Sequence, residues 1–219
     1  MAFVVSFWLA RFESRFSLYG PKKPDSNARV LCLCSDSSKQ DADDLSKVRV
    51  IVVGARGARN VGSIARVMKN FGLSSLTLVK PECEWDGPEA VFTSMRASDI
   101  IKNVSVVSSL GEALINCSRA VATTARNRSE QDHLVLENPR APLRWLLENE
   151  DADSAIIFGN EESGLSNDEL LHAQRFLTVP SADEYPTLNL AQAVAICAYE
   201  LHQLCLESKA SSSSAGAGV

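Results

Sequence analysis

The chain has 219 residues, is 45% apolar and carries a formal net charge of −5. That apolar content suffices for one domain with a buried core, which excludes disorder as a description of the whole chain. The six cysteines include no C-x-x-C pair, which argues against structural zinc. The chain has only three histidines, which gives no indication of a hydrolytic triad. No run of eighteen apolar residues occurs, which argues against a membrane-spanning helix. We therefore expect no metal and no membrane partner.

Residues 1–47 differ in composition from the rest of the chain. Up to residue 35 there are five basic residues but only two acids. Acid-poor N-terminal segments that contain arginine and serine are typical of organelle transit peptides. We interpret residues 1–47 as a transit peptide with a disordered linker and expect an organellar location, with the chloroplast preferred to the mitochondrion. The alternative is a disordered extension without a targeting function, which corresponds to a cytoplasmic protein.

Residues 48–209 alternate short β-branched runs with helical periods, a pattern typical of an α/β domain with a parallel sheet flanked by helices. Strands are predicted at residues 48–53, 75–79, 104–107, 120–123, 155–158 and 176–179. Helices are predicted near residues 61–71, 88–101, 109–117, 139–148, 166–173 and 189–206. Residues 210–219 are rich in Ser, Gly and Ala, and we expect them to form a flexible tail.

Charge is distributed unevenly along this domain. Residues 48–81 contain six Lys or Arg residues and no Asp or Glu, and residues 119–128 contain three further arginines without an acid. A basic block in an acidic protein suggests a nucleic-acid partner. Taken alone, however, a charge run is more often a solvated face than a binding site, so the choice depends on the motifs that surround it.

The turn after the first predicted strand, residues 54–63, is glycine-rich but matches neither common phosphate-binding motif. A dinucleotide fingerprint needs glycines where Arg56 and Arg59 stand, and a P-loop needs a lysine where a serine stands. The turn leads into a helix whose Arg66 and Lys69 lie one turn apart on one face, which suits phosphodiester binding. The plainer interpretation is that the glycines only permit a turn.

Two later segments also join a strand to a helix through a loop. The segment 156–166 ends at Ser166, which is predicted to form a capping box with Glu169. The segment 179–190 contains Asn189 as a predicted N-cap of the last helix. Both loops are therefore expected to be held at their helical ends.

Together with the N-x-G-x-x-A-R string at residues 60–66, these two segments resemble the three motifs of the SpoU branch of the SPOUT RNA methyltransferases. The E-Y-x-x-L-N-L-A string at residues 184–191 is most similar to the TrmJ-like subgroup, and the resemblance covers residues 48–206. It implies a trefoil-knotted α/β domain, normally a homodimer, that transfers a methyl group from S-adenosylmethionine to a ribose 2′-oxygen of tRNA or rRNA. The alternative is a catalytically inactive RNA-binding module of the same fold. A nucleotide-dependent oxidoreductase conflicts with the failed dinucleotide fingerprint.

The resemblance also implies three groups of site residues. The catalytic residues are Arg66, Asn60, Glu161 and Asn189. The residues that bind S-adenosylmethionine are Thr123, Thr124, Ala125, Gly159, Val179, Pro186, Thr187 and Leu188. The candidate RNA-binding residues, taken from the basic stretches, are Arg56, Arg59, Lys69, Arg126 and Arg128.

The expected roles follow from side-chain chemistry. A guanidinium with a pKa above about 12 is a poor base at neutral pH, so Arg66 is expected to position phosphate and ribose and to stabilise developing charge. For Glu161, a structural ion pair is the alternative to direct catalysis. The last predicted helix combines an apolar stripe with a row of alanines, from which we expect a contribution to the dimer. Cys197 and Cys205 on that helix are expected to be buried small apolar residues.

Overall fold

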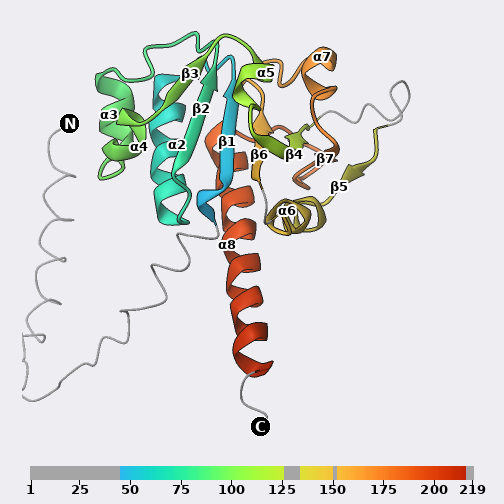
Figure 1. The fold of residues 1–219 in the computed structure, drawn as a ribbon. Coiled ribbons are helices and arrows are strands. Elements are labelled where there is room, and N and C mark those ends of the chain that lie inside the picture. Colours follow the sequence, from blue (N-terminus) through green and yellow to red (C-terminus); the bar gives the residue numbers. More distant parts are fainter. Residues whose placement is uncertain (1–44, 126–133, 150–151, 216–219) are drawn as a thin grey trace, which may run out of the picture. The chain divides into compact units, whose positions relative to one another are not determined.

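The computed structural model describes residues 45–125, 134–149 and 152–215, with side chains to residue 211 (Figure 1). Most of the predicted transit peptide and two of the candidate RNA-binding residues, Arg126 and Arg128, lie outside these ranges. Within the described ranges, no helix combines the length and apolar character needed to cross a bilayer.

The described residues form a seven-stranded sheet in the order β3-β2-β1-β6-β4-β7-β5, in which every neighbouring pair is parallel. The strands are β1 (Val48–Val53), β2 (Ser75–Val79), β3 (Ser105–Val107), β4 (Cys117–Thr123), β5 (Leu136–Glu137), β6 (Asp153–Phe158) and β7 (Arg175–Leu177). The predicted parallel α/β sheet is therefore confirmed. The two-residue strand β5 was not predicted, because it is too short to produce a hydrophobic period.

Helices connect and cover the strands (Figure 1). They are α2 (Ala58–Asn70), α3 (Pro88–Ser94), α4 (Ser98–Lys102), α5 (Leu110–Ala113), α6 (Arg140–Leu147), α7 (Asn167–Leu170) and α8 (Leu190–Ala215). The single helix predicted over residues 88–101 is wrong: Met95 adopts a positive φ of 53°, which ends α3 and separates it from α4. Helix α8 continues to Ala215, so residues 210–215 of the predicted tail are helical.

Alternate residues of the central strands enter two separate cores. Val50 and Val52 of β1 belong to the larger core, which includes buried residues of α2, α6 and α8. Ile51 and Val53 belong to the smaller core, which includes residues of α5 and α7. Since successive side chains of a strand point to opposite faces, both faces of the sheet are covered. The edge at the carboxyl ends of the strands is then left for loops.

Helix α2 lies unusually close to α3 at Gly62. A Cβ built on Gly62 would lie 2.1 Å from the Thr93 hydroxyl and 2.2 Å from the Ala90 carbonyl oxygen. No side chain fits at such distances, so this glycine is required by the contact between the two helices. The contact sets the position of α2, whose N-terminal end belongs to the site described below.

Candidate active site

Loops that follow β1, β4, β6 and β7 meet at the carboxyl edge of the sheet. Strand β6 lies between β1 and β4, so segments that are about a hundred residues apart in sequence become neighbours at this edge. Ligands of open α/β sheets bind at such points. A cavity opens here, and it is lined by all eight residues predicted to bind S-adenosylmethionine: Thr123, Thr124, Ala125, Gly159, Val179, Pro186, Thr187 and Leu188.

The loop after β6 folds back on itself around Gly159. A Cβ built there would lie 2.1 Å from the carbonyl carbon of Gly164 and 2.3 Å from the amide nitrogen of Leu165. A β-bridge between Asn160 and Gly164 closes the loop, and Gly164 has a positive φ of 67°. A side chain at position 159 would therefore overlap the backbone of its own loop.

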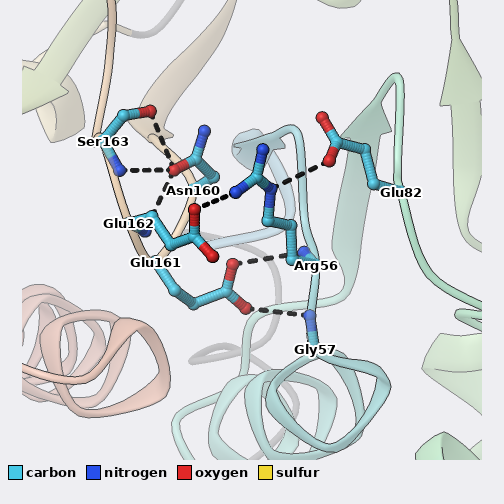
Figure 2. A network of polar contacts seen from close by, with 7 residues as sticks. All are labelled: Arg56, Gly57, Glu82, Asn160, Glu161, Glu162 and Ser163. Carbon is cyan, nitrogen blue, oxygen red and sulfur yellow. Dashed lines mark hydrogen bonds and ion pairs between the residues drawn. The ribbon is translucent and has the colours of Figure 1, made fainter.

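Asn160 organises the same loop and was not singled out from the sequence. Its side-chain oxygen accepts hydrogen bonds from the amide of Glu162 at 3.0 Å and from the amide and hydroxyl of Ser163 at 2.7 and 2.9 Å (Figure 2). An Asn at the start of a glycine-containing loop is the sequence signal for such a turn. The turn directs the carboxylates of Glu161 and Glu162 toward the loop after β1 (Figure 2).

Three of the four predicted catalytic residues form one hydrogen-bonded chain. Asn189 donates from Nδ2 to Oδ1 of Asn60 at 3.1 Å, and Asn60 donates from Nδ2 to Oε1 of Glu161 at 2.8 Å. Glu161 also accepts from the backbone amides of Arg56 and Gly57 at 3.2 and 3.1 Å. The chain therefore joins all three sequence motifs. Burial acts to raise the pKa of Glu161, but the hydrogen bonds from Asn60 and from backbone amides outweigh it and lower that pKa.

The two predicted helix caps explain how this chain is held. Asn189 accepts a hydrogen bond from the amide of Ala191 through Oδ1 at 2.9 Å, which caps α8 and turns its NH₂ group toward Asn60. Ser166 and Glu169 form the expected capping box at α7. In the loop before α8, the Ser181 hydroxyl donates to the carbonyl oxygen of Pro186 at 2.8 Å.

Arg66 is not part of this chain. It lies on an exposed part of α2 and is not among the residues that line the cavity, and its side chain forms no hydrogen bond or ion pair with the described residues. Six residues along an α-helix correspond to a rotation of roughly 240°, so Arg66 and Asn60 leave α2 in different directions. The structure thus brings together Asn60, Glu161 and Asn189 and leaves Arg66 apart.

The candidate RNA-binding residues that the structure describes are all paired with acids. Arg56 forms ion pairs with Glu82 and Glu162, as Figure 2 shows. Nη2 of Arg59 lies 3.1 Å from Oε1 of Glu89, and Nζ of Lys69 lies 2.6 Å from Oδ1 of Asp99. The basic block of residues 48–81 is therefore partly neutralised by acids that follow it in sequence, which a charge count along the chain could not show. The RNA-binding role of these residues stays a prediction.

A second, polar cavity adjoins the first and was not predicted. It is lined by Arg56, Gly57, Ala58, Arg59, Asn60, Cys83, Glu84, Gly87, Pro88 and Glu89. The Asn60–Glu161 hydrogen bond and the Arg56–Glu162 ion pair lie between the two cavities, because each joins a residue of the polar cavity to one of the first cavity. Within the part of the chain that the structure describes, no group of His, Cys, Asp and Glu is arranged to hold a metal ion.

A cavity enclosed by loops at the carboxyl edge of a parallel sheet, beside a network of polar side chains, defines an α/β domain of the kind that holds a small cofactor. The model of the SpoU rRNA methylase family matches residues 47–199, and the chain belongs to that family. The predicted resemblance is thereby confirmed.

Individual relatives agree with this assignment. The chain is 41% identical over 165 residues to the tRNA (cytidine/uridine-2'-O-)-methyltransferase TrmJ of Sodalis glossinidius, which covers 75% of this chain and 64% of that protein. The present chain therefore spans just under two-thirds of the length of this curated relative.

Two solved structures have a similar fold. A probable methylase family protein from Haemophilus influenzae is 36% identical with a TM-score of 0.69, and the match covers 75% of this chain and 69% of that chain. TrmJ from Z. mobilis is 34% identical with a TM-score of 0.66, and the match covers 71% and 69% of the two chains.

Proposed function

We propose that this protein is an S-adenosylmethionine-dependent methyltransferase that acts on a ribose 2′-hydroxyl of tRNA. The observation that carries this proposal is the Asn189–Asn60–Glu161 chain, which joins the three motifs beside the cavity. Membership of the SpoU family and the activity of the TrmJ relative, a tRNA (cytidine/uridine-2'-O-)-methyltransferase, support the reaction class and favour tRNA over rRNA.

The cavity residues fit S-adenosylmethionine by their chemistry. Ala125 and Leu188 line the cavity, where backbone amides and carbonyls can contact an adenine edge, and Val179 supplies an apolar wall. The carboxylate of Glu161, which lines the cavity, complements the positive charge of a sulfonium. When bound, the cofactor would supply a methyl group on a positively charged sulfur; as the 2′-oxygen forms the new carbon–oxygen bond with its own electron pair, the carbon–sulfur bond would break and its electron pair would stay on the sulfur.

Arg66 acts in this proposal as a positioning and charge-stabilising group. A guanidinium donates hydrogen bonds and does not accept them, so Arg66 holds an RNA phosphate and the attacking 2′-oxygen, and the hydroxyl proton passes to phosphate or water. Asn60 and Glu161 hold the loop that precedes α2, and Asn189 holds the start of α8. These contacts keep the cavity and the N-terminal end of α2 in one arrangement.

We also propose a homodimer and a trefoil knot. Since Arg66 is exposed and absent from the lining of its own cavity, a second copy that presents Arg66 to that cavity completes the site. The knot would form where the segment between β7 and α8 enters the cavity wall, as the resemblance to the SPOUT RNA methyltransferases implies. From the composition of residues 1–35 we propose an organellar location, with the chloroplast preferred.

The proposal is tested by incubating the purified chain with organellar tRNA and a methyl-labelled S-adenosylmethionine. We expect label at ribose 2′-oxygens, detected as phosphodiester bonds that resist alkaline cleavage, and no label in the Arg66→Ala variant. RNA binding without transfer would instead support the inactive binding module. Label found only on bases would overturn the proposed reaction.

A further inference from the structure

The side chain of Arg56 connects three loops at the rim of the cofactor cavity (Figure 2). Arg56 follows β1, Glu82 follows β2 and Glu162 follows β6. The guanidinium donates from Nε to Glu82 at 2.8 Å and from Nη1 to Glu162. No two of these residues are neighbours in sequence, so the contacts hold separate segments of the chain to one another.

The position of this network differs from that of an ordinary surface ion pair. Glu162 lines the cofactor cavity, whereas Arg56 lines the adjoining polar cavity. The ion pair between Arg56 and Glu162 therefore connects one wall of the cofactor cavity, the loop after β6, to the loop after β1. The side chains of Arg56, Glu82 and Glu162 are 42, 54 and 71% exposed, so each pair contributes little to overall stability and its effect is local.

Arg56 also separates two like charges. Among the described residues, it is the cation bound to both Glu82 and Glu162. If the guanidinium is removed, the two carboxylates repel each other, and the exposed carboxylate of Glu162 moves away from the rim. The carboxylates of Glu162 and then of Glu82 raise the pKa of Arg56, so its charge is present at every working pH.

We propose that Arg56 is a positioning residue for the cofactor cavity, which holds the loop after β6 in its cofactor-binding arrangement, and that it does not serve as an RNA phosphate contact. This inference rests on the proposed function, because it assumes that the cavity binds S-adenosylmethionine. It assigns to Arg56 a role different from the RNA-binding role that the basic sequence run suggests. Arg56 would thus affect cofactor affinity more than the chemical step.

The test is a double-mutant cycle in the full chain, with Kd for S-adenosylmethionine measured by calorimetry. Arg56→Ala should raise this Kd by about threefold to tenfold at low salt, as expected for two exposed ion pairs. Arg56→Lys should recover part of the loss because it keeps the charge. Glu162→Gln should raise Kd less, and the double variant Arg56→Ala/Glu162→Gln should bind no more weakly than Arg56→Ala alone, since it removes the repulsion as well.

Two further readouts separate a positioning role from a purely structural one. Arg56→Ala should raise KM for the cofactor with little change in kcat, and the difference from wild type should shrink at 1 M salt, where the Debye length is about 3 Å. Kd for tRNA should stay at the wild-type value. The matched control is Arg140→Ala, because Arg140 is also bound by two carboxylates, Glu200 and Glu207, but neither of these partners lines the cofactor cavity.

Several outcomes would overturn the inference. An unchanged cofactor Kd with weakened tRNA binding would make Arg56 an RNA contact, and fold-changes that multiply in the double variant would show independent roles. If Arg56→Ala does not fold, as judged by circular dichroism, the Glu162→Gln and Arg56→Lys variants still decide the question. A wild-type chain that binds no S-adenosylmethionine would overturn the proposed function itself, whereas an active wild type with unaffected variants would overturn only this inference.

Discussion

The side-chain amide of Asn189 donates a hydrogen bond to Oδ1 of Asn60 at 3.1 Å, across a sequence separation of 129 residues. The same side chain caps α8 through the amide of Ala191. The side chain of Asn189 therefore makes two different contacts: its amide oxygen accepts one hydrogen bond and its amide nitrogen donates the other. This arrangement explains why the start of the last helix and the N-terminal end of α2 keep a defined relation beside the cavity.

Asn189→Asp separates these two roles. Asp is as good an N-cap as Asn, so the thermal midpoint should stay near that of the wild type. Asp cannot donate to Asn60, and its charge adds to that of Glu161, so kcat/KM for methyl transfer should fall at least about tenfold. Circular dichroism melting and tRNA methylation assays check the two parts. Full activity in Asn189→Asp would contradict a role for the Asn189–Asn60 bond.

Arg66→Lys should lose most methyl-transfer activity although it keeps the charge. The planar fork of a guanidinium can hold a phosphate and the 2′-oxygen together, which a single ammonium cannot do. Because Arg66 is exposed and makes no ion pair with the described residues, its replacement should leave the thermal midpoint unchanged. Wild-type turnover in Arg66→Lys would overturn the geometric role.

Mixing two inactive variants tests whether Arg66 serves the partner's cavity. In a heterodimer of Arg66→Ala with Asn189→Asp chains, one of the two sites would combine an intact cavity with an intact Arg66. Random pairing should then restore about a quarter of wild-type activity. Each inactive variant incubated alone at the same total concentration gives the background activity. A monomer in sedimentation analysis, or no recovery on mixing, would require Arg66 to act within its own chain.

Gly62→Ala should destabilise the fold. The added methyl group would overlap the Thr93 hydroxyl and the Ala90 carbonyl, and forcing α2 and α3 apart should cost about 1–3 kcal/mol in the free energy of unfolding. The matched control is Gly111→Ala in α5, where a Cβ meets nothing within 4 Å. That change should stabilise by about 0.5–1 kcal/mol, because alanine favours helix over glycine. Urea denaturation measures both, and equal effects would contradict the close contact.

Cys197 should make the free energy of unfolding depend on pH in the alkaline range. Burial raises the pKa of the Cys197 thiol from 9.0 to about 12, because the thiolate cannot be solvated in the core. Because the pKa of the thiol is higher in the folded than in the unfolded state, the contribution of the buried Cys197 thiol to the free energy of unfolding is complete below pH 9. It is lost as the pH rises toward 12. The wild type should therefore lose up to about 1.4 kcal/mol per pH unit relative to Cys197→Ala in this range. If the free energies of unfolding of the two proteins change with pH in the same way between pH 7 and 10.5, the burial argument is contradicted.

Local patterns were sufficient to predict much of the fold. The β-branched runs of β1, β2 and β6 and the apolar period of α2 depend on neighbouring residues, so they could be recognised without the tertiary structure. The caps at Ser166 and Asn189 were predictable for the same reason. The break at Met95 was not, because the periodicity of residues 88–101 continues across it while the backbone turns to a positive φ.

The sequence by itself determined the class of sheet, the residues of the three motifs and eight of the residues that line the cavity. Only the tertiary structure decided which charges meet, since Arg56, Arg59 and Lys69 are bound by acids from other elements. It also decided that Arg66 stands apart from Asn60, although both belong to one motif. The physical reason is that helix and strand preferences act between neighbours in sequence, whereas ion pairs and hydrogen bonds depend on distances in space that arise only when strands from distant segments pair.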